Sequence, residues 1–207
     1  MQKTARLLFL TGALGCTAFW HPLSRLLASP ASRVHVSWPG FSGVPRDPGV
    51  RGIHDLASRV LAELDQLSAI IAQSMGGVVA MLAALRRPEL VTHLVLTVTS
   101  GGMDLRPFDA EDWRPAMRAA DPGLPDWFTS YHDDLTPHLP ALRMPTLLLW
   151  GDADPISPVK LGERLAALLP RAELHVFAGA DHDLGCTHAR LLAPLVDRHL
   201  ARPQPVH

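Results

Sequence analysis

The sequence is poor in cysteine, has no long apolar run and carries no excess of charge of either sign. Two cysteines, Cys16 and Cys186, occur among 207 residues. Nothing therefore resembles a disulfide framework, and two free thiols in a reducing compartment are expected. No apolar stretch approaches the ~20 residues that a membrane-spanning helix needs. The formal net charge is -1, which argues against a nucleic-acid partner. The composition indicates a cytoplasmic protein with neither nucleic acid nor a membrane as its partner.

Short apolar segments alternate with longer amphipathic segments along most of the chain. The apolar segments predict six strands, at 6–10, 33–37, 68–72, 94–98, 146–150 and 174–178. Apolar residues at helical spacing predict helices at 53–67, 76–87, 157–169 and 188–200. Ser157 is the expected N-cap of the third of these helices. Continuously apolar strands that alternate with helices predict one doubly wound α/β domain over 1–207, with a mainly parallel six-stranded sheet.

Residues 104–140 interrupt this alternation. The segment is rich in proline, acidic residues and aromatic residues and contains no convincing strand. We expect it to form an insertion of one or two short helices that covers one end of the sheet. In an open parallel sheet, binding sites form at the carboxyl ends of the strands. The residues that follow each predicted strand are therefore the candidates for chemistry.

A serine follows the third predicted strand and precedes a buried helix. The stretch Ala72-Gln73-Ser74-Met75-Gly76 fits the strand–turn–helix elbow G-x-S-x-G, with alanine in place of the first glycine. Such a turn holds the serine hydroxyl away from the backbone and directs the helix N-terminus at it. The alternative is an ordinary N-cap serine, since short patterns of this kind also occur by chance.

An aspartate and a histidine follow two later strands. Asp152 and Asp154 lie in "GDADPISP" after the fifth strand, and His182 lies in "GADHDLG" after the sixth. A serine nucleophile needs a base to take its proton, and the base needs a carboxylate to hold its tautomer. Alone, Asp154 is consistent with a turn residue and His182 with a loop histidine. Serine, aspartate and histidine at three strand ends, in that chain order, favour a catalytic triad.

These motifs together resemble the α/β-hydrolase family. The resemblance rests on "AQSMGG", "LLLWGDADPISP", "FAGADHDLG" and "SWPGFSGVP", and it covers nearly the whole chain except 104–140. It implies Ser74 as nucleophile, His182 as base and Asp154 as acid, with Asp152 as a turn residue. Asp104 occupies the rarer alternative position of the family acid. The family has two more strands before the first one found in this sequence, so the resemblance implies a reduced fold.

The stretch "LLFLTGALGC", residues 7–16, permits two interpretations. Taken alone, it resembles a bacterial lipoprotein signal. Within the family pattern, Thr11-Gly12-Ala13-Leu14-Gly15 matches H-G-x-x-G with threonine in place of histidine. The resemblance then implies that the backbone N–H groups of Ala13 and Met75 form the oxyanion hole. We favour this second interpretation, because removal of the stretch would delete a core strand and half of the oxyanion hole.

The remaining candidates concern substrate and cofactor. Aromatic and sulfur-containing side chains are expected to line an apolar substrate pocket under the insertion: Trp20, Met103, Trp113 and Trp127. The cluster Asp181, His182, Cys186 and His188 does not have the spacing of a structural zinc site. Neither a metal nor an organic cofactor is expected.

The predicted function is that of a serine hydrolase acting on an ester or thioester of a small, largely apolar molecule. Two alternatives stay open. One is a cofactor-free lyase or C–C hydrolase that uses the same triad, similar to enzymes that make menaquinone precursors. Basic side chains in the pocket would favour it, and Arg106, Arg114 and Arg118 are the nearby candidates. The other is a non-catalytic binding protein on the same fold.

Overall fold

The computed structural model describes residues 3–121, 123–125, 128–129, 131 and 133–203. Six parallel strands form one sheet in the order β2-β1-β3-β4-β5-β6. Their bounds are β1 Arg6–Leu10, β2 Ser32–Val36, β3 Ser68–Gln73, β4 Val91–Thr97, β5 Thr146–Gly151 and β6 Ala172–Phe177. The strand order reverses direction after β2, as in a doubly wound sheet. The predicted fold class is confirmed.

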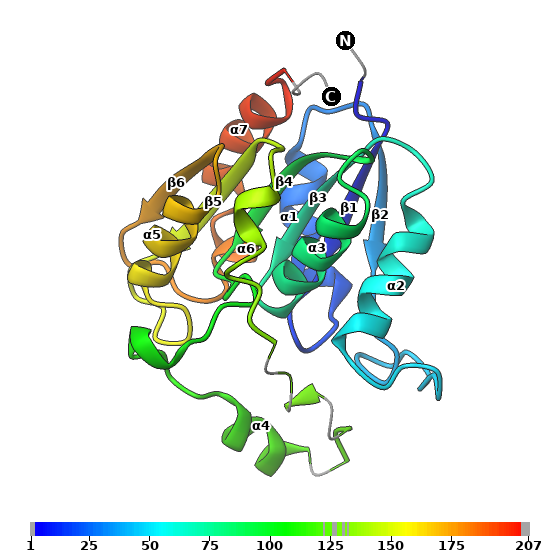
Figure 1. Cartoon of the computed structure of the whole chain (residues 1–207), viewed down its shortest axis with the longest axis vertical. Coiled ribbons are helices and arrows are strands. Elements are labelled where there is room, and N and C mark those ends of the chain that lie inside the picture. The colour runs from blue at the N-terminus through cyan, green and yellow to red at the C-terminus, as the bar shows by residue number, and fades with distance from the viewer. Residues whose placement is uncertain (1–2, 122, 126–127, 130, 132, 204–207) are drawn as a thin grey trace.

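Helices cover both faces of this sheet (Figure 1). One face packs against α2 (Ile53–Glu63), α3 (Met75–Arg86) and α5 (Val159–Leu168). The other packs against α1 (His21–Leu26), α6 (Leu184–Thr187) and α7 (Ala189–Leu200). Alternate residues of one strand enter the two cores: Leu8 and Leu10 of β1 face α3, while Leu7 and Phe9 face α1. The inner strands β3 and β5 are buried on both faces, which explains why they are almost entirely apolar, whereas the edge strands β2 and β6 carry polar residues.

Two of the four predicted helices differ from the structure by more than one residue at one end. The helix predicted over 53–67 ends at Glu63, because Leu64 leaves the helical conformation with a ψ of 64°. The helix predicted from Ser157 begins at Val159, after Pro158. Ser157 is therefore not its N-cap. The Ser157 hydroxyl instead donates to the carbonyl of Val98 over 2.8 Å, which joins the ends of β4 and β5.

The apolar stretch near the start of the chain forms β1, which lies inside the sheet between β2 and β3. Leu7, Leu8, Phe9 and Leu10 have no exposed surface, and β1 pairs with β2 on one side and with β3 on the other. The stretch is thus structural in the folded chain. No helix in the described part of the chain is both long enough and apolar enough to cross a membrane.

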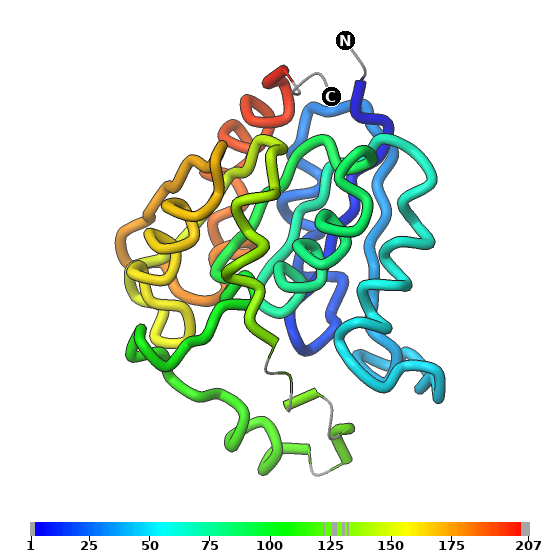
Figure 2. The backbone as a smooth tube through the Cα atoms, in the orientation of Figure 1, coloured from blue at the N-terminus to red at the C-terminus, as the bar shows by residue number. Residues whose placement is uncertain are grey.

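The segment 104–140 lies across the carboxyl ends of the strands and is called the cap below. Its described residues include the helix α4 (Arg114–Ala120), the 3-10 helix Arg106–Phe108 and, at its end, the start of the 3-10 helix Leu139–Ala141. The tube in Figure 2 shows it as a long excursion away from the sheet, at the bottom of the view. This arrangement places cap side chains opposite the residues that follow β3, β4 and β5.

Candidate active site

Ser74 occupies a sharp turn between β3 and α3. Its backbone has φ 53° and ψ -122°, a conformation that is strained for a residue with a side chain. The turn is crowded. A Cβ at Gly76 would lie 2.3 Å from the carbonyl oxygen of Thr11, and one at Gly77 would lie 2.5 Å from Oγ1 of Thr99. Only glycine fits at these two positions, which explains the pair of glycines after the serine.

His182, which is partly exposed, pairs with the buried Asp154 in loops near this turn. Nδ1 of His182 lies 2.7 Å from Oδ2 of Asp154, and the Asp154 side chain has no exposed surface. The other carboxylate oxygen, Oδ1, accepts the backbone N–H groups of Ile156 (2.9 Å) and Ser157 (3.1 Å). Both oxygens of the buried carboxylate thus have partners, as a buried charge requires. An acceptor on Nδ1 leaves Nε2 of His182 free to take a proton.

The loop that carries His182 is also tied to the serine turn. Nε2 of Gln73 donates to the backbone carbonyl of His182 over 3.3 Å. Asp104, the alternative acid, lies elsewhere: its carboxylate binds Arg106, and this contact lowers the pKa of Asp104. The structure thus pairs His182 with Asp154 and not with Asp104. Asp152 accepts the N–H of Gly179 over 2.6 Å, as a turn residue does.

The segment Thr11–Gly15 follows β1 and lies against the serine turn. A Cβ at Gly12 would lie 3.4 Å from Cβ of Ser74. The carbonyl of Gly12 accepts the N–H of Gly15 over 3.1 Å, which closes a tight turn around Ala13. The Met75 N–H lies at the first residue of α3, where a helix has no internal acceptor for it. Both predicted oxyanion donors are therefore on segments that adjoin Ser74.

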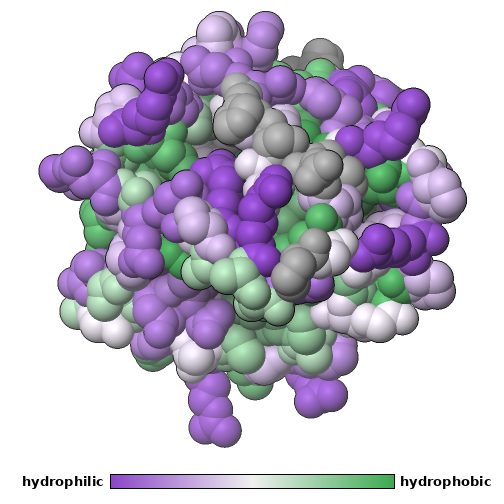
Figure 3. Space-filling model, turned by 90° about the horizontal axis from the view of Figure 1, so that it is seen from below, coloured by the Kyte–Doolittle hydropathy of each residue, from purple (hydrophilic) through white to green (hydrophobic). Residues whose placement is uncertain are grey.

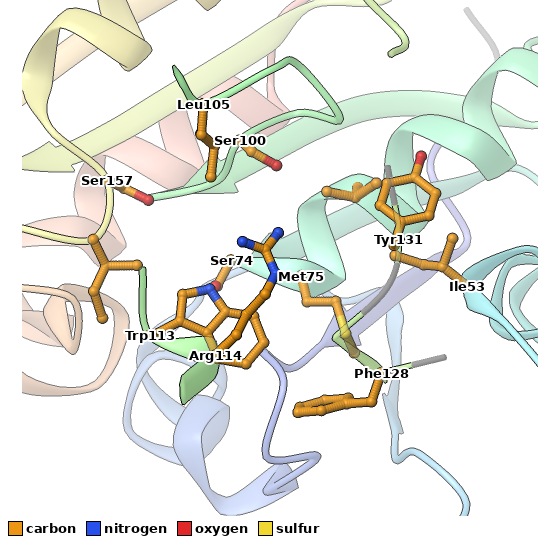
Figure 4. Close-up of a pocket in the computed structure, with 12 residues that line it drawn as sticks. Ile53, Ser74, Met75, Ser100, Leu105, Trp113, Arg114, Phe128, Tyr131 and Ser157 are labelled. Carbon is orange, nitrogen blue, oxygen red and sulfur yellow. The ribbon is translucent and has the colours of Figure 1, made fainter. Parts of the chain in front are cut away.

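A cavity opens over Ser74 between the sheet and the cap. Figure 4 shows side chains from both parts around it, with Trp113 and Arg114 contributed by the cap. The lining consists of Ile53, Ser74, Met75, Val78, Ser100, Leu105, Trp113, Arg114, Phe128, Tyr131, Ile156 and Ser157. A second cavity adjoins it and shares Ser100, Leu105, Arg114 and Tyr131. From the cap end, the surface shows apolar side chains among hydrophilic ones (Figure 3).

Two of the four residues predicted to line a substrate pocket do line a cavity. Trp113 lines the cavity over Ser74, and Met103 lines the adjoining one. The prediction that Trp20 lines the pocket is wrong. Trp20 is fully buried on the opposite face of the sheet, packed against Phe9 and Phe19. Its indole N–H donates to the carbonyl of Leu10, so it belongs to the core. Trp127 lies outside the described residues.

Several lining residues were missed by the sequence analysis. Ser100, Ile156 and Ser157 follow β4 and β5, so their place after a strand was the signal that would have found them. Ile53 and Val78 lie on helices that also pack against the core. Apolar residues on a helix predict core packing, and no sequence signal distinguishes a core residue from one that also lines a cavity.

The charged groups near the cavity are unevenly engaged. Arg106 is paired with Asp104, and Nε of Arg118 donates to Oγ1 of Thr129 over 2.7 Å. The guanidinium of Arg114 lies 5.5 Å from the ring centroid of Trp113 and contacts Asp112 over 3.2 Å. Burial, together with Asp133 and Asp134, raises the pKa of Tyr131. Arg114 is the positive group that lines the cavity with Ser74.

In the described residues, no group of three or more histidine, cysteine or acidic side chains is arranged to hold a metal ion. Cys16 and Cys186 are free thiols.

Comparison with known families supports this description of the fold. The family model described as "alpha/beta hydrolase fold" matches residues 5–139 and 131–189. The two matched ranges cover the serine turn, the Asp154 loop and the His182 loop.

The relatives that this chain resembles have names that describe different activities. A polyketide synthase of Burkholderia thailandensis, ThaQ, is 30% identical over 64% of this chain, which spans 8% of that protein. A 2-hydroxymuconate semialdehyde hydrolase of Pseudomonas putida is 28% identical over 67% of this chain and 64% of its own length. A thermophilic esterase from Thermogutta terrifontis superposes with a TM-score of 0.77 and 19% identity, covering 97% of this chain and 90% of that one. The last likeness concerns the fold alone.

Proposed function

Because the chain belongs to the alpha/beta hydrolase fold family, we propose that it is a serine hydrolase. Its substrate is an ester or thioester of a small, largely apolar molecule, and an acyl-enzyme is the intermediate. The observation that carries this proposal is the contact between His182 and Asp154 beside the strained turn of Ser74. A buried carboxylate with both oxygens engaged costs free energy to bury, and orientation of a catalytic base is a reason to keep it.

The reaction divides into two steps. Oγ of Ser74 attacks the carbonyl carbon while Nε2 of His182 takes the serine proton. The tetrahedral intermediate collapses, the alcohol or thiol leaves with that proton, and the acyl group stays on Ser74. Water then attacks the acyl carbon as His182 takes its proton, and Ser74 leaves as the protonated hydroxyl. Asp154 holds His182 and stabilises its positive charge in both steps.

Negative charge that develops on the carbonyl oxygen needs donors. The N–H groups of Ala13 and Met75 supply them from the two segments that adjoin Ser74. Loss of one such donor costs about 3 kcal/mol of transition-state stabilisation. Backbone donors do not depend on the side chain, so Thr11 in place of the family histidine is compatible with activity.

The apolar part of the lining supports an apolar acyl or alcohol group. Ile53, Val78 and Leu105 come from three different segments, and Trp113 and Phe128 close the cavity from the cap. Apolar surface of this kind binds without fixing direction. Orientation of the scissile carbonyl would then come from the oxyanion donors.

A second candidate is the hydrolysis of a carbon–carbon bond in a substrate with a carboxylate. The observation that favours it is Arg114, whose guanidinium lines the same cavity as Ser74. Arginine binds a carboxylate through two parallel hydrogen bonds. The relative from Pseudomonas putida carries the name of a hydrolase of 2-hydroxymuconate semialdehyde. Both candidates use Ser74 and His182, and they differ in what the cavity holds.

A fluorophosphonate probe tests the feature that both candidates share. We expect the probe to label the wild type and not Ser74→Ala. Absence of labelling in the folded wild type would contradict a serine nucleophile and favour the non-catalytic alternative. After labelling, p-nitrophenyl esters of rising acyl length, assayed in parallel with 2-hydroxymuconate semialdehyde, separate the two candidates.

A further inference from the structure

Trp38 lies just after β2 and is fully buried beneath the segment Thr11–Gly15. Its indole Nε1–H donates to the carbonyl of Gly12 over 2.9 Å and to that of Thr11 over 3.3 Å. The same ring packs near Gly15, where a Cβ would lie 3.4 Å from Cδ1 of Trp38. One side chain thus contacts both ends of the tight turn that carries Ala13.

The hydrogen bond to Gly12 has a geometric consequence for the next residue. The C=O of Gly12 and the N–H of Ala13 belong to one peptide unit, and the described chain has no cis peptide bond. In a trans peptide the two groups point in opposite directions. A carbonyl that is held toward Trp38 therefore directs the Ala13 N–H away from Trp38. Among the described residues, this N–H has no acceptor.

The peptide unit lies where an oxyanion donor is needed. Gly12 approaches the nucleophile, since its Cβ would lie 3.4 Å from Cβ of Ser74 and 2.2 Å from Oε1 of Gln73. The carbonyl oxygen of Thr11 would lie 2.3 Å from a Cβ at Gly76 of the serine turn. The turn Thr11–Gly15 is packed between Trp38 on one side and the serine turn on the other. A shift of Trp38 would therefore displace Ala13.

The side chain of Thr11 does not perform this task. Its hydroxyl is buried and has no hydrogen-bond partner in the described part of the chain. The turn is instead held from the loop after β2, by Trp38 at Gly12 and by Ser42, whose hydroxyl donates to the carbonyl of Leu14 over 2.8 Å. This loop thus supplies side-chain contacts that position 11 does not.

We propose that Trp38 is a positioning residue of the oxyanion hole: its indole N–H fixes the Gly12–Ala13 peptide so that the Ala13 N–H points at the reacting carbonyl. The inference rests on the proposed serine-hydrolase function. It assigns to the loop after β2 a part in the stabilisation of the transition state, although Trp38 itself is buried away from the cavity lining.

The test is Trp38→Phe, with Trp20→Phe as the matched control. Trp20 is also fully buried, and its indole N–H donates to a backbone carbonyl, that of Leu10, over 2.9 Å. Each variant loses one indole donor and some ring volume, so both are expected to lower Tm. We expect Trp38→Phe to lower kcat for a p-nitrophenyl ester by about 10- to 100-fold, part of the loss seen when an oxyanion donor is removed. KM should change little, and Trp20→Phe should keep kcat within about twofold.

A second variant removes the donor alone and guards against a folding defect. Trp38 is replaced by 3-benzothienylalanine, in which sulfur takes the place of the indole N–H and the ring shape is kept. The same fall in kcat is expected, with a smaller fall in Tm than in Trp38→Phe, because the ring volume is kept. Wild-type kcat in this variant would overturn the role of Trp38. If the wild type itself neither labels with fluorophosphonate nor turns over, the serine-hydrolase proposal fails instead, so the two failures are distinguishable.

Discussion

Asp154 contacts His182 through one carboxylate oxygen and two backbone N–H groups through the other. The backbone donors come from Ile156 and Ser157, which also line the cavity over Ser74. The loop after β5 therefore holds the acid, orients the base and forms part of the substrate wall. Asp154 itself does not line the cavity, so a change at Asp154 should affect chemistry far more than binding.

Asp154→Asn should abolish most turnover while the chain stays folded. The amide oxygen can still accept from Ile156 and Ser157, but the amide NH₂ would face Nδ1 of His182 and force the proton onto Nε2. A loss on the order of 10⁴ in kcat is expected, measured with p-nitrophenyl acetate beside a thermal melt. Asp104→Asn is the control and should keep kcat, because Asp104 binds Arg106 and not His182. The assignment is wrong if only the Asp104 variant loses activity.

Gly76→Ala should destabilise the fold as well as the site. The new Cβ would lie 2.3 Å from the carbonyl oxygen of Thr11 and 2.9 Å from that of Leu10, both of them backbone atoms that cannot move alone. A loss of about 1–3 kcal/mol in the free energy of unfolding is expected from this overlap. Urea unfolding followed by circular dichroism measures it. Gly52→Ala has open space around the new Cβ and should change stability by no more than about 0.5 kcal/mol.

Arg114→Gln should separate the two candidate substrate classes. If the substrate carries a carboxylate, loss of a charge-assisted hydrogen-bonding partner should raise KM for 2-hydroxymuconate semialdehyde by about 10- to 100-fold. Hydrolysis of p-nitrophenyl acetate should be nearly unchanged. Arg106→Gln removes an arginine that is paired with Asp104 and serves as control. An equal effect of Arg114→Gln on both substrates would argue against carboxylate recognition by Arg114.

His199 should make stability fall as the pH drops below neutrality. It lies in α7 with a 2% exposed surface, and burial, with His93 and Arg202 nearby, lowers its pKa from 6.5 to about 3. Between these values the unfolded chain binds a proton that the folded chain does not, so stability is full above about pH 6.5 and is lost as the pH falls. One such group contributes up to about 1.4 kcal/mol per pH unit.

His199→Gln tests this contribution. Urea unfolding between pH 6.5 and 5 should show a shallower dependence on pH than the wild type, by about one proton at most. His93 also has a pKa lowered by burial, so part of the dependence should persist. His138→Gln, which removes an exposed histidine, is the control. Equal slopes for His199→Gln and the wild type would contradict the assignment.

The sheet and the serine turn were predictable because each requires particular residue types at nearby positions in the sequence. Strands buried on both faces must be apolar throughout, and a turn that touches the end of β1 must carry glycine at Gly76. The contact of His182 with Asp154 was predictable from their places after the neighbouring parallel strands β5 and β6. These features depend on residue type and order alone.

Side-chain direction was not predictable in this way. Trp20 and Trp113 are both tryptophans near the carboxyl end of the sheet, yet Trp20 lies in the core behind β1 and Trp113 lines the cavity. The difference depends on which face each segment packs against, which periodicity does not reveal in short 3-10 turns and irregular loops. The contact of Trp38 with Gly12 joins residues 26 positions apart, and no local sequence pattern predicts it.

Part of the cavity wall lies on a stretch of chain that carries none of the proposed catalytic groups. Trp113, Arg114, Phe128 and Tyr131 belong to the cap, whereas Ser74, Asp154 and His182 follow strands of the sheet. Exchange of the cap for another sequence would thus alter selectivity without touching the bond-breaking apparatus. This part of the wall can vary while the proposed catalytic groups stay unchanged, so a library confined to the cap is the natural starting point for directed evolution.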